Sequence, residues 1–364
     1  MTDNITPGPV VLFGSGETSP SGKRIFDHAL AQIALGGSLS GPPNIALLET
    51  PAGFELNSTH VIQRVADFLQ IHLQNYQPQT VIVPARKKGT SYSPNDAEIT
   101  APLLRADMIF MGPGSPSYAV RQLKNSLAWY RMIASHRLGA TLTLASAATV
   151  AVSAFSLPVY EIYKVGEEPH WKVGLDLFGP YGVPLVFIPH WNNQDGGEEL
   201  DTSRCFMGRS RFDTLMDMLP PGIPVIGLDE KTALLFDFRA GEGLVLGLGG
   251  VEILTGPKQP HQTGKVFKTR TSFPLSEIGD FQIPNGSFGL PDEVWQFAQQ
   301  FRSEAQNGQA SLPPQTVIDL VDQREAARKR KDWNNADALR HEILQLGWNV
   351  KDTPEGPLVE KASK

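Results

Sequence analysis

The sequence predicts an α/β protein with a doubly wound, mainly parallel sheet and a small helical hairpin at its C-terminal end. Short apolar runs alternate with amphipathic segments over the first two-thirds of the 364 residues. Such runs are typical of strands buried on both faces of a parallel sheet. Strands that alternate with helices fold into layered α/β domains. The expected strands are Val10–Phe13, Ile45–Leu48, Val81–Val83, Met108–Met111, Thr141–Ala145, Leu185–Ile188 and Val225–Leu228.

Helices are expected between these strands. Apolar residues recur at helical spacing over residues 61–73, after an N-cap at Asn57 or Ser58. A second helix follows Pro116, because proline suits the first turn of a helix. A third spans Cys205–Leu219 and ends before two prolines.

The pattern divides the chain into three regions. Close-spaced strands with glycine turns over residues 232–254 predict a hairpin that completes an α/β domain, residues 1–254. Residues 255–314 are rich in Gly, Pro, Gln and Ser, and they predict a connector with a short helix at Asp292–Phe301. Residues 315–364 carry two apolar stripes at helical spacing and predict the helical hairpin.

Composition excludes several classes of protein. Hydrophobic residues make up 41% and charged residues 19%, so the chain can bury a core and is not globally disordered. The net charge of −6 provides no global basic field for nucleic acid. One cysteine excludes an intramolecular disulfide framework and a cysteine-based zinc site, and neither a metal nor a cofactor is expected. The first ten residues show no signal-peptide pattern, so a cytoplasmic location is expected.

Residues 138–160 form an uncharged stretch that is long enough to span a membrane. The stretch also contains Pro158 and several hydroxyl side chains, which a membrane span disfavours. We therefore interpret it as a buried strand followed by a helix of small residues, and we expect no membrane partner.

Ser146 is the sharpest catalytic candidate. It follows an expected strand and precedes an expected helix, with Ala145, Ala147 and Ala148 as neighbours. A nucleophile elbow needs small neighbours because its backbone turns tightly, and it predicts strained backbone angles at the serine. A serine that caps an ordinary helix would give the same local pattern.

Other polar residues follow the ends of expected strands, where ligands bind in parallel α/β sheets. His190 is a candidate general base for a serine, or a structural histidine bonded to a loop carbonyl. Gly112-Pro113-Gly114 offers backbone N–H groups to an oxyanion, or forms only a tight turn. Asp229-Glu230 is interpreted as an acid pair that organises a loop, and Cys205 as a packing residue.

The order of these segments resembles the cyanophycinase and dipeptidase E family of serine peptidases, over roughly residues 9–254. That family has the class I glutamine amidotransferase-like, flavodoxin-type fold and cuts bonds next to acidic residues. The segments that carry the resemblance are Ser146-Ala147, Gly112-Pro113-Gly114-Ser115-Pro116, His190, Arg209-Ser210-Arg211-Phe212 and Gly227-Leu228-Asp229-Glu230-Lys231-Thr232-Ala233-Leu234.

The resemblance implies a Ser146 nucleophile, a His190 base and an acid shortly after the serine. Glu161 is the best match for that acid, with Glu167 and Glu168 as alternatives. The implied substrate is small or acidic and peptide-like. The residues implied for the substrate and the oxyanion are Gly112, Pro113, Gly114, Ser115, Arg209, Arg211, Asp229, Glu230 and Thr232.

Two departures from the family pattern support an alternative reading. The family elbow reads Gly-x-Ser-Ala-Gly, whereas this chain reads Leu144-Ala145-Ser146-Ala147-Ala148, so neither glycine is present. In addition, 18 residues separate His190 from Arg209, which is a long insertion for these peptidases. The alternative is a catalytically inactive binding protein that keeps the pocket, with a tail that docks tRNA or a protein.

The tail resembles the C-terminal segment of cysteinyl-tRNA synthetases over residues 315–361, through Leu320–Arg328, Lys331–Arg340 and Asp352–Gly356. This resemblance implies tRNA as a partner, with Arg328-Lys329-Arg330-Lys331 as the phosphate contacts. The same basic run is also typical of a solvated helix face. The HIGH-type and KMSKS-type signatures of the synthetases are not found, so we do not expect aminoacylation.

The small size of the tail predicts that it needs support. Trp333 and Trp348 are expected to cover the core between its two helices. A unit of this size buries little apolar area. We therefore expect it to contact the α/β domain or a second chain, which leaves a homo-oligomer open.

Overall fold

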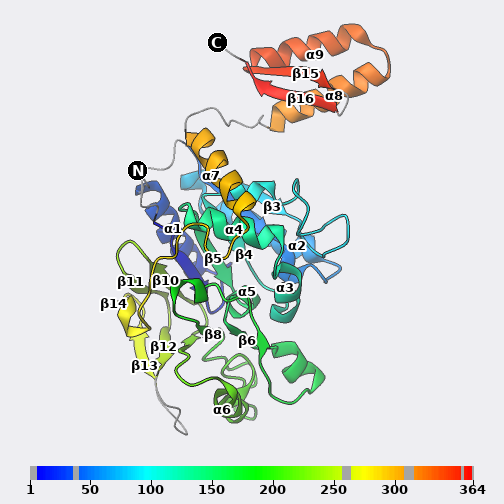
Figure 1. Cartoon of the computed structure of the whole chain (residues 1–364). Helices are drawn as coiled ribbons and strands as arrows, with labels where there is room; N and C mark the ends of the chain where they lie inside the picture. The colour runs from blue at the N-terminus through cyan, green and yellow to red at the C-terminus, as the bar shows by residue number, and fades with distance from the viewer. Residues whose placement is uncertain (1–5, 36–40, 256–263, 307–314, 354–355, 363–364) are drawn as a thin grey trace. The chain divides into compact units, whose positions relative to one another are not determined.

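The computed structural model describes residues 6–35, 41–255, 264–306, 315–353 and 356–362. The chain divides into two compact units, Met1–Ala298 and Gln299–Lys364 (Figure 1).

The first unit is built around a large, mainly parallel sheet, which confirms the predicted fold class. In the described residues its strands lie in the order β14-β11-β10-β1-β5-β4-β2-β3. The five strands from β1 to β3 pair in parallel, whereas β10, β11 and β14 add an antiparallel edge. The strands are β1 (Val10–Phe13), β2 (Asn44–Leu48), β3 (Gln79–Val83), β4 (Met108–Met111), β5 (Thr141–Ala145), β10 (Thr232–Asp237), β11 (Glu242–Gly247) and β14 (Ser272–Pro274).

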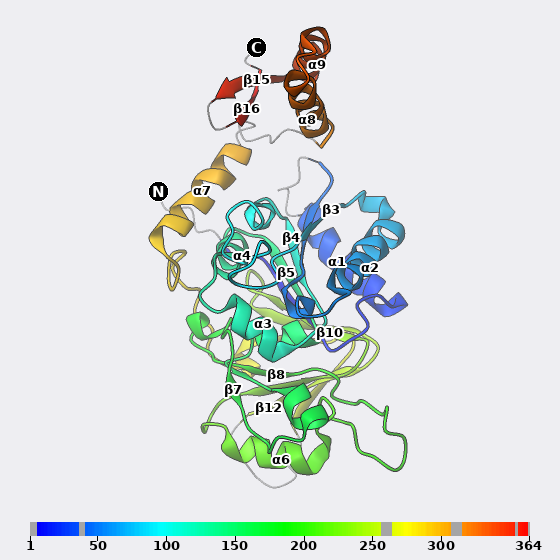
Figure 2. The ribbon, with the colours of Figure 1, turned by 90° about the vertical axis from the view of Figure 1, so that its right-hand side faces the viewer.

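Alternate residues of the central strands enter two different cores. Val10 and Leu12 of β1 pack with one core, and Val11 and Phe13 with the other. Both faces are therefore covered by helices, and Figure 2 shows α1 and α2 on one side of the sheet and α3 and α4 on the other. These helices are α1 (Pro20–Leu35), α2 (Ser58–His72), α3 (Pro116–Leu123) and α4 (Leu127–Arg137).

Two of the predicted strands belong to a second sheet instead of the main one. β8 (Val186–Ile188) and β9 (Val225–Leu228) pair in parallel and are extended by β12 (Gly250–Leu254) and β13 (Lys265–Lys268). The helix α6 (Gly208–Met218) packs on this sheet. The chain passes from β9 to β10 of the main sheet within three residues, and this corner brings the two sheets together.

Part of the expected connector is structured. Residues 264–306 contain β13, β14 and α7 (Asp292–Gln306). β14 is an edge strand of the main sheet and pairs with β11. β13 is an edge strand of the second sheet and pairs with β12. Residues 256–263 and 307–314 lie outside the described part of the chain.

Short elements link the larger ones. The uncharged stretch of residues 138–160 forms β5, the helix α5 (Ala147–Ala151) and the start of a small ribbon, as interpreted from its polar content. None of the helices in the described residues has the length and apolar character that a membrane crossing requires. The remaining short elements are β6 (Phe155–Ser156), β7 (Lys172–Val173), η1 (Thr50–Ala52), η2 (Gln74–Tyr76), η3 (Ala101–Leu104), η4 (Glu161–Val165), η5 (Gly179–Tyr181) and η6 (Leu275–Glu277).

The second unit is a helical hairpin with a strand hairpin added to it. α8 (Gln315–Lys329) and α9 (Trp333–Gln345) pack together, and β15 (Trp348–Thr353) pairs with β16 (Gly356–Lys361). The sequence analysis missed these two strands. Their apolar positions alternate and are few, so they give no helical signal.

One of the two expected core tryptophans is in place. Trp348 is buried in a cluster with Val317 and Ile343. The expectation for Trp333 was wrong, since 57% of this residue is exposed. Trp333 is the first residue of α9, directly after the N-cap Asp332, and from this end position its ring does not enter the core between the helices.

Candidate active site

Ser146 lies at a strained turn between β5 and α5. Its backbone angles are φ 52° and ψ −110°, which agrees with the geometry expected of a nucleophile elbow. Its side chain does not cap α5, so the helix-cap alternative does not describe this serine.

Small buried neighbours make this turn feasible without glycine. Ala145 and Ala148 are fully buried, and Ala147 is nearly so. The turn is also tied to the sheet, because the Thr149 hydroxyl bonds to the carbonyl oxygens of Phe13 and Leu144. Tertiary contacts therefore hold the serine in a backbone region that non-glycine residues seldom adopt.

His190 reaches Ser146 from the second sheet. It follows β8, and its own N–H donates to the carbonyl of Gly14 at 3.2 Å, which joins the two sheets at this point. Its Nε2 lies 3.1 Å from the Ser146 Oγ. The backbone of His190 also has a positive φ of 51°, so two residues of the site are held in uncommon conformations.

The carboxylate on the other side of the His190 ring belongs to Glu230. Its Oε1 lies 2.9 Å from the His190 Nδ1 and also accepts a hydrogen bond of 2.9 Å from the Asn193 side chain. The Glu230 N–H donates to the Asn192 Oδ1 at 2.8 Å. The loop that directly follows His190 thus holds Glu230 at two points. Asn192 accepts a hydrogen bond from the Glu230 backbone, and Asn193 donates one to the Glu230 carboxylate.

Electrostatics favour an ionised Glu230. The hydrogen bond from His190 holds the pKa of Glu230 below its ordinary value; partial burial opposes this, and the bond from Asn193 adds to it. An ionised Glu230 accepts a hydrogen bond from the His190 Nδ1–H, and this tautomer leaves Nε2 free to accept the Ser146 hydroxyl proton. The arrangement is that of a serine, a base and an orienting acid.

Glu161 does not occupy the place expected of it. Its carboxylate pairs with Lys172 at 2.7 Å on the π-helical turn η4. Burial opposes ionisation there, but the bond from Lys172 keeps the pKa of Glu161 below its ordinary value. The alternatives are also placed elsewhere, because Glu167 pairs with His170 at 3.6 Å and the Glu168 carbonyl contacts the same ring.

The loop after β4 is only partly available to an oxyanion. Pro113 has no N–H, and the Ser115 N–H donates to the Pro51 carbonyl at 2.9 Å. The Ser115 hydroxyl caps α3 by accepting from the Tyr118 N–H. Of the four residues predicted, this leaves the N–H groups of Gly112 and Gly114 as candidate donors.

Asp229 and Thr232 organise the corner between the sheets. The Asp229 carboxylate accepts from the Gly250 N–H at 2.8 Å, and burial raises its pKa. The Thr232 hydroxyl donates to the Glu230 carbonyl and accepts from the Gly249 N–H. Both side chains act on the backbone around Glu230, as the loop-organising interpretation expects.

Arg209 and Arg211 lie on α6, where both are exposed. The Arg209 N–H bonds to the Asp201 carboxylate at 2.8 Å. The hydrogen bonds described for Ser146, His190 and Glu230 involve neither arginine. The structure therefore does not bring these two predicted residues into the Ser146 group.

Cys205 is a buried neighbour of the site, as its interpretation as a packing residue expects. Burial raises the pKa of its thiol to about 12. It does not lie in a helix as predicted, because Arg204, Cys205 and Phe206 have φ values of 57°, 59° and 68° and form a left-handed turn. α6 therefore begins only at Gly208.

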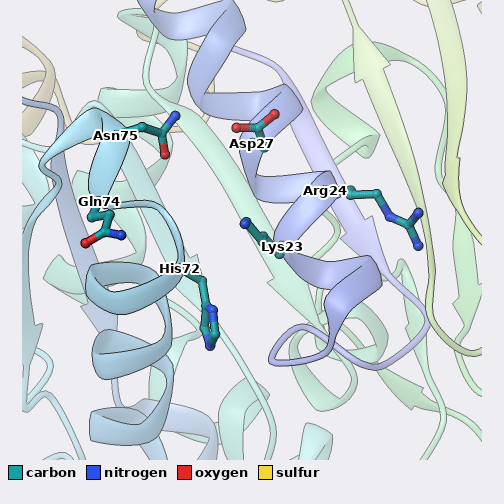
Figure 3. Close-up of a pocket in the computed structure, with 6 residues that line it drawn as sticks. All are labelled: Lys23, Arg24, Asp27, His72, Gln74 and Asn75. Atoms are coloured by element: carbon teal, nitrogen blue, oxygen red, sulfur yellow. The ribbon is translucent and has the colours of Figure 1, made fainter.

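Hollows lie on the described surface of the first unit, and two of them are defined by the residues that line them. One, of 400 Å³, is lined by residues of the 192–204 loop, including Asn192 and Asn193. The other, of 530 Å³, lies between α1 and the end of α2, where Figure 3 shows Lys23 and His72 in the intervening space and Arg24 turned away. Within the described residues, no group of three or more His, Cys, Asp or Glu side chains is arranged to hold a metal ion.

The tail matches a known family. Residues 313–356 fit the family described as the cysteinyl-tRNA ligase anticodon binding domain. The cysteine–tRNA ligase of Methanosarcina acetivorans is 48% identical over 60 residues, which are 16% of this chain and 12% of that ligase. The ligase of Methanosarcina mazei is 49% identical over 51 residues, which are 14% of this chain and 11% of that ligase. The chain thus spans about an eighth of the length of these relatives.

The fold of the chain matches a solved peptidase structure. The crystal structure of a peptidase from an acI-B1 actinobacterium superposes with a TM-score of 0.58 at 20% identity. The match covers 74% of this chain and 98% of that peptidase. At this identity the likeness shows the fold alone.

The sequence analysis did not place Glu230 and Asn193 together beside His190. Glu230 was interpreted as part of a loop-organising pair, because the acid was sought shortly after Ser146. The sequence did contain a signal for both residues, which is their place in the chain. Asp229-Glu230 and Asn192-Asn193 each follow the end of an expected strand.

Proposed function

We propose that the first unit is a serine-type amide or peptide hydrolase. The observation that carries this proposal is the chain of hydrogen bonds from Ser146 through His190 to Glu230, built on a strained serine. In it Ser146 is the nucleophile, His190 the general base and Glu230 the acid that orients the ring. The peptidase-like fold supports the assignment. The resemblance of the sequence segments to dipeptidase E-type enzymes supports a small or acidic peptide-like substrate.

The proposed reaction has two stages. The Ser146 Oγ attacks the carbonyl carbon of the amide while the His190 Nε2 takes the hydroxyl proton. The oxyanion that forms is stabilised by the N–H of Ala147, the residue after the nucleophile, together with that of Gly112 or Gly114. His190 then gives its proton to the leaving amine, and water releases the acyl group from Ser146 by the same steps.

A fluorophosphonate probe tests this proposal. We expect stoichiometric labelling of the wild type at Ser146, located by peptide mass spectrometry, and none of Ser146→Ala. Ser210→Ala, an exposed serine on α6, is the matched control and should label like the wild type. A folded wild type without label at Ser146 would favour the inactive binding protein.

Asn193 is proposed as a positioning residue. Asn193→Ala removes one of the two side-chain donors to the Glu230 Oε1, and loss of a bond to a charged group predicts a roughly 10- to 100-fold lower kcat/KM. The pKa of Glu230 should also rise, because a donor to its ionised form is lost. Since the orienting carboxylate is needed in its ionised form, the acid limb of the pH–kcat/KM profile should move to higher pH.

Gln194→Ala is the matched control for Asn193. Gln194 is exposed on the same loop, and only its backbone carbonyl bonds within the loop. We expect its pH profile to match the wild type. A lower kcat/KM for Asn193→Ala with an unmoved acid limb would reduce Asn193 to a structural role.

A second proposal concerns the tail, which we infer binds tRNA. Its match to an anticodon binding domain supports this, together with three exposed cations at the end of α8, Lys329, Arg330 and Lys331. Arg328 is not among them, because it pairs with Asp352 at 2.8 Å. The buried Arg324 also pairs with Asp352, so both arginines hold the tail together.

Salt dependence tests the tail. Replacing Lys329, Arg330 and Lys331 together by Ala should weaken binding of bulk tRNA in a gel shift and flatten its dependence on salt, because fewer counterions are released. A triple Ala variant at Arg239, Lys268 and Arg270, exposed cations of the first unit, is the matched control and should bind like the wild type. Equal binding by both variants, or none by the wild type, would contradict a tRNA site on this surface.

A further inference from the structure

We infer that the site binds an uncharged aromatic or aliphatic side chain on the leaving-group side of the scissile amide, against a surface formed by Phe206 and Tyr163. The inference rests on the proposed hydrolase function and adds a substrate class to it. It concerns only the side chain on the amine side of the scissile bond. The proposal for the acyl side of the substrate is unchanged.

The first observation is the left-handed turn that presents Phe206 to His190. Residues other than glycine adopt this conformation singly and reluctantly, yet three consecutive residues of the turn do so. The turn is fastened to the site, since the N–H groups of Cys205 and Arg204 donate to the carbonyls of His190 and Trp191 at 3.2 Å and 3.0 Å. The turn places the centroid of the Phe206 ring 5.6 Å from the centroid of the His190 imidazole.

The second observation is that Tyr163 extends this aromatic surface outward. Its ring centroid lies 5.4 Å from that of Phe206, and 36% of the residue is exposed. Tyr163 lies in the π-helical turn η4, a kind of local distortion that often redirects a side chain at functional sites. Two rings thus lead from the imidazole to solvent.

The third observation is that the cations on or next to these elements already have partners. The Lys164 ammonium of η4 lies over the Tyr160 ring, 5.9 Å from its centroid. Lys172 pairs with Glu161, the first residue of η4, at 2.7 Å. The Arg204 guanidinium lies over the Trp191 ring, 4.2 Å from its centroid. An acidic side chain placed on Phe206 and Tyr163 would lose water and would have to compete with these contacts for a cation, whereas an apolar one would gain contact with the rings.

The mechanism determines which half of the substrate meets these rings. His190 must give its proton to the leaving amine, so the amine nitrogen lies next to Nε2 when the bond breaks. The side chain attached to that amine is therefore the one nearest to the rings that flank the imidazole. Phe206 and Tyr163 are in this way specificity residues for the leaving group.

Aminolysis of an acyl-enzyme tests the inference without knowledge of the natural substrate. p-Nitrophenyl acetate would acetylate Ser146 and release p-nitrophenol. An added amino acid amide then attacks the acetyl ester through its amine, forming an N-acetyl amide and restoring the Ser146 hydroxyl, while water competes to give acetate. The measured quantity is the ratio of N-acetyl amide to acetate, which does not depend on the rate of acetylation.

We expect phenylalaninamide and leucinamide to capture the acetyl group roughly tenfold better than glycinamide or the α-amide of aspartic acid. Phe206→Ala should bring these ratios close together, and Phe206→Leu should keep part of the preference because it stays apolar. Phe288→Ala is the matched control and should keep the wild-type ratios. Phe288 is exposed, and its carbonyl contacts Arg137. Arg137 precedes the start of β5, whereas Ser146 follows the end of β5, so Phe288 lies at the edge of the sheet opposite the site.

The outcomes separate the two proposals. Acetylation of Ser146 followed by equal capture of all four amides, or an unchanged preference in Phe206→Ala, would overturn the aromatic subsite and leave the hydrolase intact. Absence of acetylation at Ser146 in the folded wild type, with Ser146→Ala as the blank, would overturn the hydrolase proposal and the subsite with it.

Discussion

Replacement of Glu230 by Gln is expected to lower the rate of acylation of Ser146 by roughly 10⁴-fold, as loss of the orienting carboxylate does in other serine triads. Glutamine at this position has no charge to stabilise the imidazolium, and its amide can hold the ring in the wrong tautomer. The measurement is the second-order rate constant for fluorophosphonate labelling, with thermal unfolding as a check on the fold.

Glu161→Gln is the matched comparison for this change. Both carboxylates contact one cationic or ionisable partner, but Glu161 contacts Lys172 whereas Glu230 contacts His190. We expect Glu161→Gln to label within a few-fold of the wild type. Its free energy of unfolding should fall by only about 1 kcal/mol or less, since the pair is partly exposed. If Glu161→Gln labelled much more slowly than Glu230→Gln, Glu161 would be the orienting acid instead of Glu230.

Gly114→Ala is expected to lower the acylation rate by roughly 100-fold, in the range seen when one oxyanion donor is lost. Gly114 has a φ of 143°, and an added Cβ would overlap the Pro51 carbonyl and the Ala52 nitrogen. The backbone of the loop would have to move, and the Gly114 N–H would move with it. The same clash should lower the melting temperature.

Gly139→Ala separates the clash from the backbone strain. Gly139 also has a positive φ, of 104°, but no heavy atom lies within 4 Å of the position of its Cβ. We expect this variant to lose some stability and to keep the wild-type acylation rate. If Gly114→Ala and Gly139→Ala have the same acylation rate at a temperature where both are fully folded, the Gly114 loop does not take part in the reaction.

The candidate site was partly accessible from sequence because strand ends are visible in sequence. Ser146 follows the apolar run of β5, and His190 follows that of β8. A rule about strand ends was therefore enough to nominate both, although they belong to different sheets. The same rule also nominated Asp229-Glu230 after β9, but as a pair that organises a loop and not as the acid beside His190. The preference for an acid close to Ser146 in the chain directed the choice to Glu161 instead.

The tail illustrates a different limit. Helical periodicity predicted α8 and α9, because apolar residues repeat where the helices face each other. It did not predict β15 and β16, or the burial of Arg324 against Asp352, since an ion pair between distant residues leaves no periodic pattern. The basic run was therefore predicted with four cations, whereas the structure leaves three of them exposed.

The sequence by itself determined most strands of the main sheet, most of the helices, the fold class and the two candidates Ser146 and His190, because each depends on local patterns of apolar and small residues. Only the tertiary structure decided that Glu230 and Asn193 complete the hydrogen-bonded group and that Phe206 flanks the imidazole. These contacts form where the corner between β9 and β10 and the left-handed turn before α6 meet. Such contacts depend on packing between segments far apart in the chain, and no local pattern of residues encodes that packing.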